Sequence, residues 1–200
     1  MFLQIAVKRT TDWLMQGGSI TEEDRKVYEF GLDKLFSMLI NFGFVAGIGL
    51  LFGMFAQTFI FYIAYIGLRI YAGGYHADKP LRCFVMSISI IIPCLLLIRL
   101  PQMWNVPIVF YSLLGFGVII LALLGPVGNK NKVLDELEKV VYRRRLLRNL
   151  ATVTTTAIIL FVLTLYDYSA ATLCGILLSA VAAIVGKVKF IVQMRNTVKS

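Results

Sequence analysis

The feature that most constrains the fold is a long uncharged stretch, residues 35–68, which contains no Asp, Glu, Lys or Arg. As one helix, at a rise of 1.5 Å per residue, it would be much longer than the hydrocarbon core of a bilayer, which is roughly 30 Å thick. The stretch therefore predicts two short membrane spans that fold back on each other. We expect the turn between Gly53 and Gln57.

The rest of the chain is equally apolar. Hydrophobic residues make up 58% of it, charged residues only 16%, and the mean hydropathy is +0.80, all outside the usual range of soluble domains. We expect an all-α, polytopic membrane protein with about six transmembrane helices, preceded by amphipathic N-terminal helices. The predicted spans are residues 36–53, 55–71, 84–100, 106–125, 150–166 and 170–186.

The first 34 residues mix apolar and charged side chains. Residues 1–16 suit a helix that lies along the membrane surface, and the pairs Ser19/Glu22 and Thr21/Asp24 have the spacing of capping boxes that start a second helix. The alternative is an anchor that only sets topology. We expect one integral membrane domain over residues 1–200, with surface helices in 1–34, spans in 35–186 and a cytoplasmic tail in 187–200.

The basic residues predict the orientation. The net charge is +9, and 19 of the 20 Lys and Arg residues fall in segments that are cytoplasmic if the N-terminus is inside; Arg99 is the exception. Lys8 and Arg9 are followed by polar residues rather than by the apolar core of a secretory signal, which agrees with a cytoplasmic N-terminus. Because the charges cluster between apolar runs, topology and lipid headgroups explain them better than nucleic acid does.

The cysteines and the single histidine limit metal chemistry. Cys83, Cys94 and Cys174 lie in or beside apolar runs without CxxC spacing. The single histidine could supply only one further ligand to a metal ion. We expect no disulfide framework, no metal and no cofactor.

The segment YAGGYHADKPLRC, residues 71–83, concentrates reactive groups. Asp78 and Pro80 indicate a helix start, which places Cys83 in a first turn where the helix dipole favours thiolate. His76 is a base near neutral pH, and Gly73, Gly74 and Pro80 are suited to a chain reversal that folds it back over Cys83. The alternatives are that Cys83 is a small apolar filler and that His76 only decorates a loop at headgroup level. The pattern predicts a cysteine–histidine nucleophilic centre.

The spacing of Arg69, Gly74, His76 and Cys83 resembles that of the accessory gene regulator B (AgrB) family, the membrane endopeptidases of bacterial peptide quorum sensing. The segment GPVGNKNKVLDELEKVVYRRR, residues 125–145, is similar to the family's proline-then-basic loop after span four. The resemblance covers most of the chain. It implies a multi-pass protein of the bacterial cell membrane, with His76 and Cys83 catalytic, and a homodimer.

The resemblance also implies a substrate and a reaction. An AgrD-like precursor peptide lies on the membrane lipids, Cys83 attacks it to give an acyl-enzyme thioester, and an internal Cys or Ser of the precursor closes a (thio)lactone ring. Arg69, Gly74 and Asp78 are candidate orienting or supporting residues. Asp78 alternatively only caps span three, and Arg69 alternatively reaches lipid phosphates. Candidate binders of the precursor's acidic tail are Lys130, Lys132, Arg143, Arg144 and Arg145.

Two other classes of function remain open from the sequence. One is a non-enzymatic peptide exporter or membrane scaffold, against which stands the scarcity of ionisable residues within the spans. The other is a membrane acyltransferase with Cys83 as carrier, although the chain has no histidine-rich cysteine motif.

Overall fold

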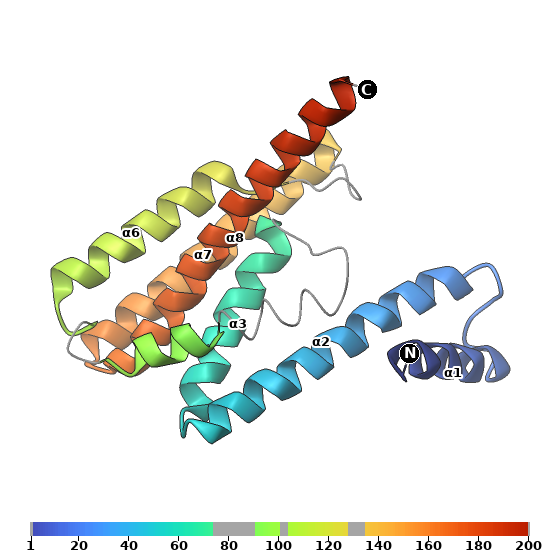
Figure 1. The fold of residues 1–200 in the computed structure, drawn as a ribbon, viewed down its shortest axis with the longest axis horizontal. Helices are drawn as coiled ribbons and strands as arrows, with labels where there is room; N and C mark the ends of the chain where they lie inside the picture. Colours follow the sequence, from blue (N-terminus) through green and yellow to red (C-terminus); the bar gives the residue numbers. More distant parts are fainter. Residues whose placement is uncertain (1, 74–90, 101–103, 128–134, 200) are drawn as a thin grey trace. The chain divides into compact units, whose positions relative to one another are not determined.

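A computed structural model describes residues 2–73, 91–100, 104–127 and 135–199. In these ranges the chain is predominantly helical and has no β-strand. The long helices are α1 (Phe2–Gln16), α2 (Arg25–Leu51), α3 (Phe55–Ala72), α6 (Pro107–Leu124), α7 (Glu136–Val162) and α8 (Tyr166–Lys199) (Figure 1). The all-α expectation is confirmed.

Five of these helices are long and apolar enough to cross a membrane: α2, α3, α6, α7 from Leu137, and α8 as far as Lys189. They correspond to five of the six predicted spans. Part of the other predicted span, 84–100, lies outside the described residues, and its described part is helical over residues 91–98. The chain is a multi-pass membrane protein.

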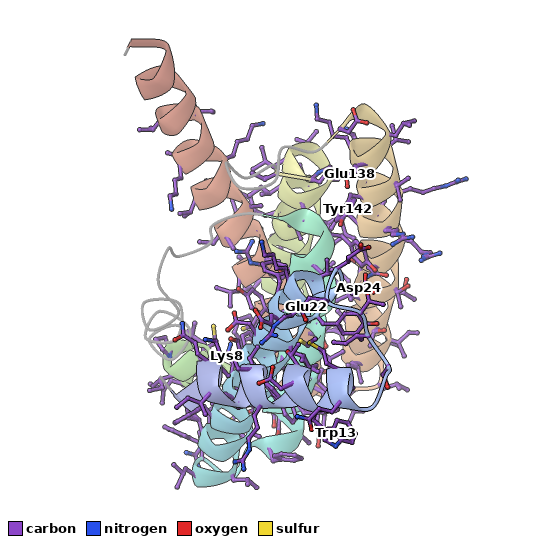
Figure 2. The ribbon with its side chains drawn as sticks, turned by 90° about the vertical axis from the view of Figure 1, so that its right-hand side faces the viewer. Lys8, Trp13, Glu22, Asp24, Glu138 and Tyr142 are labelled. Carbon is purple, nitrogen blue, oxygen red and sulfur yellow. The ribbon has the colours of Figure 1, made fainter. Side chains whose placement is uncertain are left out.

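The chain divides into two compact units, residues 1–47 and 48–200. In the first unit, Arg25 joins α1 to the start of α2, with its Nη2 2.8 Å from Asp12 Oδ1 and its Nε 3.1 Å from Glu29 Oε1. These ion pairs are partly exposed and screened by solvent, so each contributes little to stability. Lys8 and Trp13 project from α1, and Trp13 is 70% exposed, as suits a helix at a membrane surface (Figure 2).

The predicted second surface helix and the first span are one continuous helix, α2. The sequence from Arg25 to Leu51 contains no proline, and its glycines cost helix stability without ending the helix. The Thr21 hydroxyl donates to the Asp24 carboxylate at 2.8 Å, so this predicted capping pair lies in the turn before α2 rather than in its first helical turn.

The second unit begins with the predicted hairpin between α2 and α3. Gly53 has φ of 65°, and the Met54 N–H donates to the Gly49 carbonyl at 2.7 Å, which closes the last turn of α2. The Thr58 hydroxyl, buried beneath this turn, donates to the Met54 carbonyl at 2.7 Å. The predicted position of the turn is confirmed.

Helix α8 is the centre of the second unit and packs against α3, α6 and α7 (Figure 1). In α8, 67% of the most apolar 18-residue stretch is buried. In α6, the corresponding share is 22%. Small side chains allow this close approach: Ala170, Ala171, Ser179, Ala180 and Ala183 are all buried. These small residues therefore serve packing within this chain.

Gly175 marks a close approach between α8 and α3. A Cβ atom at this position would lie 2.9 Å from Ala64 Cβ, 3.1 Å from the Phe61 carbonyl oxygen and 3.1 Å from the Tyr65 nitrogen. Two of these neighbours are backbone atoms, which move only if the helices separate. The glycine therefore sets the distance between the two helices.

We expect Gly175→Ala to lower the free energy of unfolding by about 1–3 kcal/mol, because the added methyl group overpacks the α3–α8 contact. Gly115→Ala on α6 is the matched control, since a Cβ atom there meets nothing within 4 Å and alanine favours the helix. Thermal unfolding in detergent micelles measures both variants. Equal effects at the two positions would contradict this account of the packing.

Candidate functional site

Most of the predicted catalytic segment lies outside the described residues. This applies to Gly74, His76, Asp78 and Cys83, and equally to Lys130 and Lys132 in the basic segment. The structure does describe the residues on which these segments are anchored: the end of α3, residues 125–127 after α6, and the basic N-terminal part of α7.

Arg69 lies in the last turn of α3 and is half-buried. Its Nη1 donates to the carbonyl of Gly73, and the Gly73 N–H donates to the Arg69 carbonyl at 3.3 Å. A guanidinium at this position satisfies a carbonyl at the helix end and complements the negative end of the helix dipole. Arg69 thus fixes Gly73, the last described residue of the predicted catalytic segment.

Gly73 is held by a second, long-range contact. The Val127 N–H donates to the Ala72 carbonyl at 2.9 Å, and Gly73 and Val127 form an isolated parallel bridge. Gly73 has φ of 68°, which L-residues rarely adopt, and a Cβ atom there would overlap the Val127 carbonyl oxygen. We call this backbone contact between residues 72–73 and 127 the α3 clamp.

Helix α7 packs beside the same end of α3. The rings of Tyr71 and Tyr142 meet edge to face at 6.0 Å, and Asn149 Nδ2 donates to the Gly67 carbonyl at 3.0 Å. Figure 2 labels Tyr142 and Glu138, one turn apart on α7. The end of α3, from which the predicted catalytic segment continues, therefore lies against the basic part of α7.

Gly125 connects the α3 clamp to α7. A Cβ atom on Gly125 would overlap Leu146 Cδ2 and would lie 2.9 Å from the Leu121 carbonyl oxygen and 3.8 Å from Ala72 Cα. Leu146 is fully buried. Residues 125–127 are thus packed between the end of α3 and the inner face of α7.

The basic residues of α7 correct one sequence expectation. The segment was expected to be a loop as far as residue 149, but α7 begins at Glu136, because residues 136–149 are mostly strong helix formers. Arg143, Arg144, Arg145 and Arg148 are all exposed. Apolar side chains are exposed in the turns before them, Leu137 at 77% and Val140 at 67%, as in helices at a membrane–water interface.

The helix at the C-terminus brings a similar correction. The last span was expected to end near residue 186, with a tail after it, whereas α8 runs on to Lys199. No proline follows residue 126, and the residues after 186 include good helix formers such as lysine, methionine and arginine. The apolar part that can cross a membrane ends at Lys189.

Two thiols lie close together within the described part of the second unit. Cys94 and Cys174 are free cysteines whose thiol groups are within hydrogen-bonding reach of each other. Sequence reasoning placed both inside spans but missed their proximity, because no spacing signal links residues 80 positions apart. In the parts of the chain that the structure describes, no group of three His, Cys, Asp or Glu side chains is placed to hold a metal ion.

Comparison with known proteins decides the family. The sequence model of "Accessory gene regulator B" (AgrB) matches residues 7–185, which is most of the chain. The chain belongs to the AgrB family. Membership of this family links the protein to peptide quorum sensing and agrees with its multi-pass membrane fold. It also confirms the family expected from the spacing of Arg69, Gly74, His76 and Cys83.

Relatives of the AgrB family in other bacteria are moderately similar. An AgrB-like protein of Listeria monocytogenes serovar 1/2a is 32% identical over 102 residues, 50% of this chain and 47% of the relative. FsrB of Enterococcus faecalis is 34% identical over 84 residues, 40% of this chain and 35% of FsrB. The match thus spans about half or less of the length of these relatives. No solved structure matches the chain.

Proposed function

We propose that this protein is a membrane cysteine endopeptidase that cleaves an AgrD-like precursor and promotes its cyclisation to an autoinducing peptide. The observation that carries the proposal is the AgrB match over residues 7–185, within which His76 and Cys83 stand at the family's catalytic spacing. The enzyme acts at the cytoplasmic face of the bacterial cell membrane, with both termini on that side, and works as a homodimer.

In the proposed mechanism, His76 removes the proton from the Cys83 thiol and the thiolate attacks the scissile carbonyl of the precursor. The tetrahedral intermediate collapses, the C–N bond breaks, and protonated His76 gives its proton to the leaving amine. The acyl group is now a thioester on Cys83. A thiol or hydroxyl within the acyl peptide then attacks this thioester, so the ring closes and Cys83 is released as thiol.

The anchoring of the segment around Gly73 supports this reaction. His76 follows Gly73 by three residues, so their Cα atoms can be at most about 11 Å apart. The α3 clamp and the Arg69 guanidinium both fix Gly73. His76 is therefore tethered within a short reach of a rigid point, which a general base needs if it is to meet its nucleophile. Asp78 and Gly74 are proposed to support this geometry.

The exposed arginines of α7 supply a binding surface for the precursor. Arg143, Arg144 and Arg145 are exposed on a helix that packs beside the end of α3, so an acidic tail bound there lies near the start of the catalytic segment. The exposed apolar side chains in the turns before the arginines, Leu137 and Val140, suit an amphipathic peptide at the membrane surface. We propose that Lys130 and Lys132 extend this surface.

Charge reversal tests the docking step. We expect Arg144→Glu with Arg145→Glu to weaken precursor capture by at least tenfold, because two attractive charge contacts become repulsive, with little change in the turnover of bound peptide. Reversing acidic residues in the precursor tail to Lys should restore part of the capture. Arg99→Glu, outside the proposed surface, is the control. Intact capture with lost turnover would contradict a docking role.

The endopeptidase itself is tested with purified protein in liposomes and a synthetic precursor that carries an amphipathic leader, an internal Cys and an acidic tail. The proposal predicts release of the tail and a cyclic thiolactone, both detected by mass spectrometry. Export of an uncut precursor across the liposome membrane would instead favour the exporter.

A further inference from the structure

We infer that the α3 clamp is a positioning device for the catalytic segment, and that Gly73 and Val127 hold the segment that carries His76 in the orientation that the reaction requires. The inference rests on the proposed endopeptidase function and adds to it two residues that neither touch the substrate nor take part in proton transfer.

The clamp joins two parts of the chain that are more than fifty residues apart. The Val127 N–H donates to the Ala72 carbonyl at 2.9 Å, directly after the last turn of α3, and the bridge then pairs Gly73 with Val127. The Arg69 guanidinium donates to the Gly73 carbonyl, and the Gly73 N–H donates to the Arg69 carbonyl, so the end of α3 has three hydrogen bonds in all. If the chain after α3 were an unconstrained loop, one capping motif at the helix end would be enough.

The clamp requires glycine at residue 73 for two separate reasons. The φ of 68° disfavours any residue with a Cβ atom, and such an atom would also overlap the Val127 carbonyl oxygen. The overlap is with backbone, so no side-chain rotation relieves it. Any side chain at this position must displace Val127 or turn the chain that leaves α3.

Gly53 is a matched control at the opposite end of the same helix. It has φ of 65°, close to that of Gly73, but a Cβ atom there meets nothing within 4 Å. Gly53→Ala therefore also places a Cβ atom at a positive φ on a residue that flanks α3, without touching the clamp. A loss of activity confined to Gly73→Ala is then not the general effect of alanine at a positive φ beside this helix.

The experiment compares Gly73→Ala and Gly53→Ala in liposomes with the synthetic precursor. We expect Gly73→Ala to lower kcat on the order of 100-fold, the effect of misplacing a catalytic group by about 1 Å, with KM unchanged. Gly53→Ala should keep the wild-type kcat. Equal kcat values for the two variants would overturn the inference, whereas failure of wild-type protein to cleave would overturn the proposed function instead.

A second readout separates positioning from general destabilisation. In a background with Cys94→Ala and Cys174→Ala, the rate of alkylation of Cys83 by a maleimide is measured against pH. If the clamp places His76 beside the thiol, Gly73→Ala should move the midpoint of this profile to higher pH, and Gly53→Ala should not. A midpoint that moves equally in both variants would contradict the clamp.

A measurement on wild-type protein covers the case in which Gly73→Ala does not fold. Hydrogen–deuterium exchange should show the Val127 amide protected, because its N–H is bound to the Ala72 carbonyl. Exchange of this amide at the rate of an unstructured peptide would rule out the clamp without any variant.

Discussion

Cys83→Ala should abolish precursor cleavage and leave precursor capture intact. Without the sulfur no thioester forms, and the remaining groups only bind the peptide, so we expect turnover to fall by at least 10³-fold. Cleavage is measured by mass spectrometry of the released tail, and capture by co-purification of the precursor with the membrane protein.

The double variant Cys94→Ala, Cys174→Ala is the control, and it should keep wild-type turnover. Both residues lie within the helical core of the second unit, with Cys174 buried and Cys94 partly so, and each has the other thiol as its neighbour. Loss of activity in this control, or cleavage by Cys83→Ala, would mean that the nucleophile has been assigned to the wrong cysteine.

His76→Gln should lower turnover by about 10²–10⁴-fold, the usual contribution of a general base, and should also slow alkylation of Cys83 near neutral pH. Glutamine keeps a polar side chain of similar size but cannot accept the thiol proton. The rate of maleimide labelling of Cys83 between pH 5 and pH 9, compared with wild type, is the measurement.

The thermal unfolding of His76→Gln should match that of wild type, since a loss of fold would lower turnover for another reason. An unchanged labelling profile together with unchanged turnover would exclude His76 as the base. An unchanged labelling profile with low turnover would leave His76 to protonate the leaving amine, and would remove its role in forming the thiolate.

The membrane architecture could be predicted from the sequence because it depends on local composition. The uncharged run of residues 35–68 is too long for one span, and Gly53 is available for the left-handed backbone that the turn needs. Apolar runs bounded by charge likewise located α3 and α6 within a few residues of their observed ends. Span positions can therefore be predicted without knowing which helices contact each other.

Helix ends that lie outside the apolar runs were predicted less well. The change between charged and apolar residues near residues 149 and 186 was interpreted as a span boundary, and no helix was predicted beyond either boundary. Helix formation continues wherever good helix formers continue, so α7 extends back to Glu136 and α8 forward to Lys199. The hydropathy of the side chains sets where a span ends, whereas helix propensity sets where the helix ends.

The contacts around the candidate site could not be predicted from the sequence at all. In a membrane protein both the lipid-facing and the buried sides of a helix are apolar, so periodicity does not reveal that α8 is central or that α7 packs on the end of α3. The α3 clamp is a backbone contact between distant residues, and the only sequence signal for it is a glycine at residue 73, beside a second glycine that obscures its role.

Direct observation of the covalent intermediate tests the central claim. Purified wild-type protein in liposomes is mixed with a precursor whose internal Cys is replaced by Ala, so that ring closure cannot remove the acyl group, and the reaction is quenched in acid. The account predicts a mass increase equal to the acyl fragment, carried on Cys83 and released by hydroxylamine. No adduct on the protein while the tail is released, or an adduct on another residue, would contradict it.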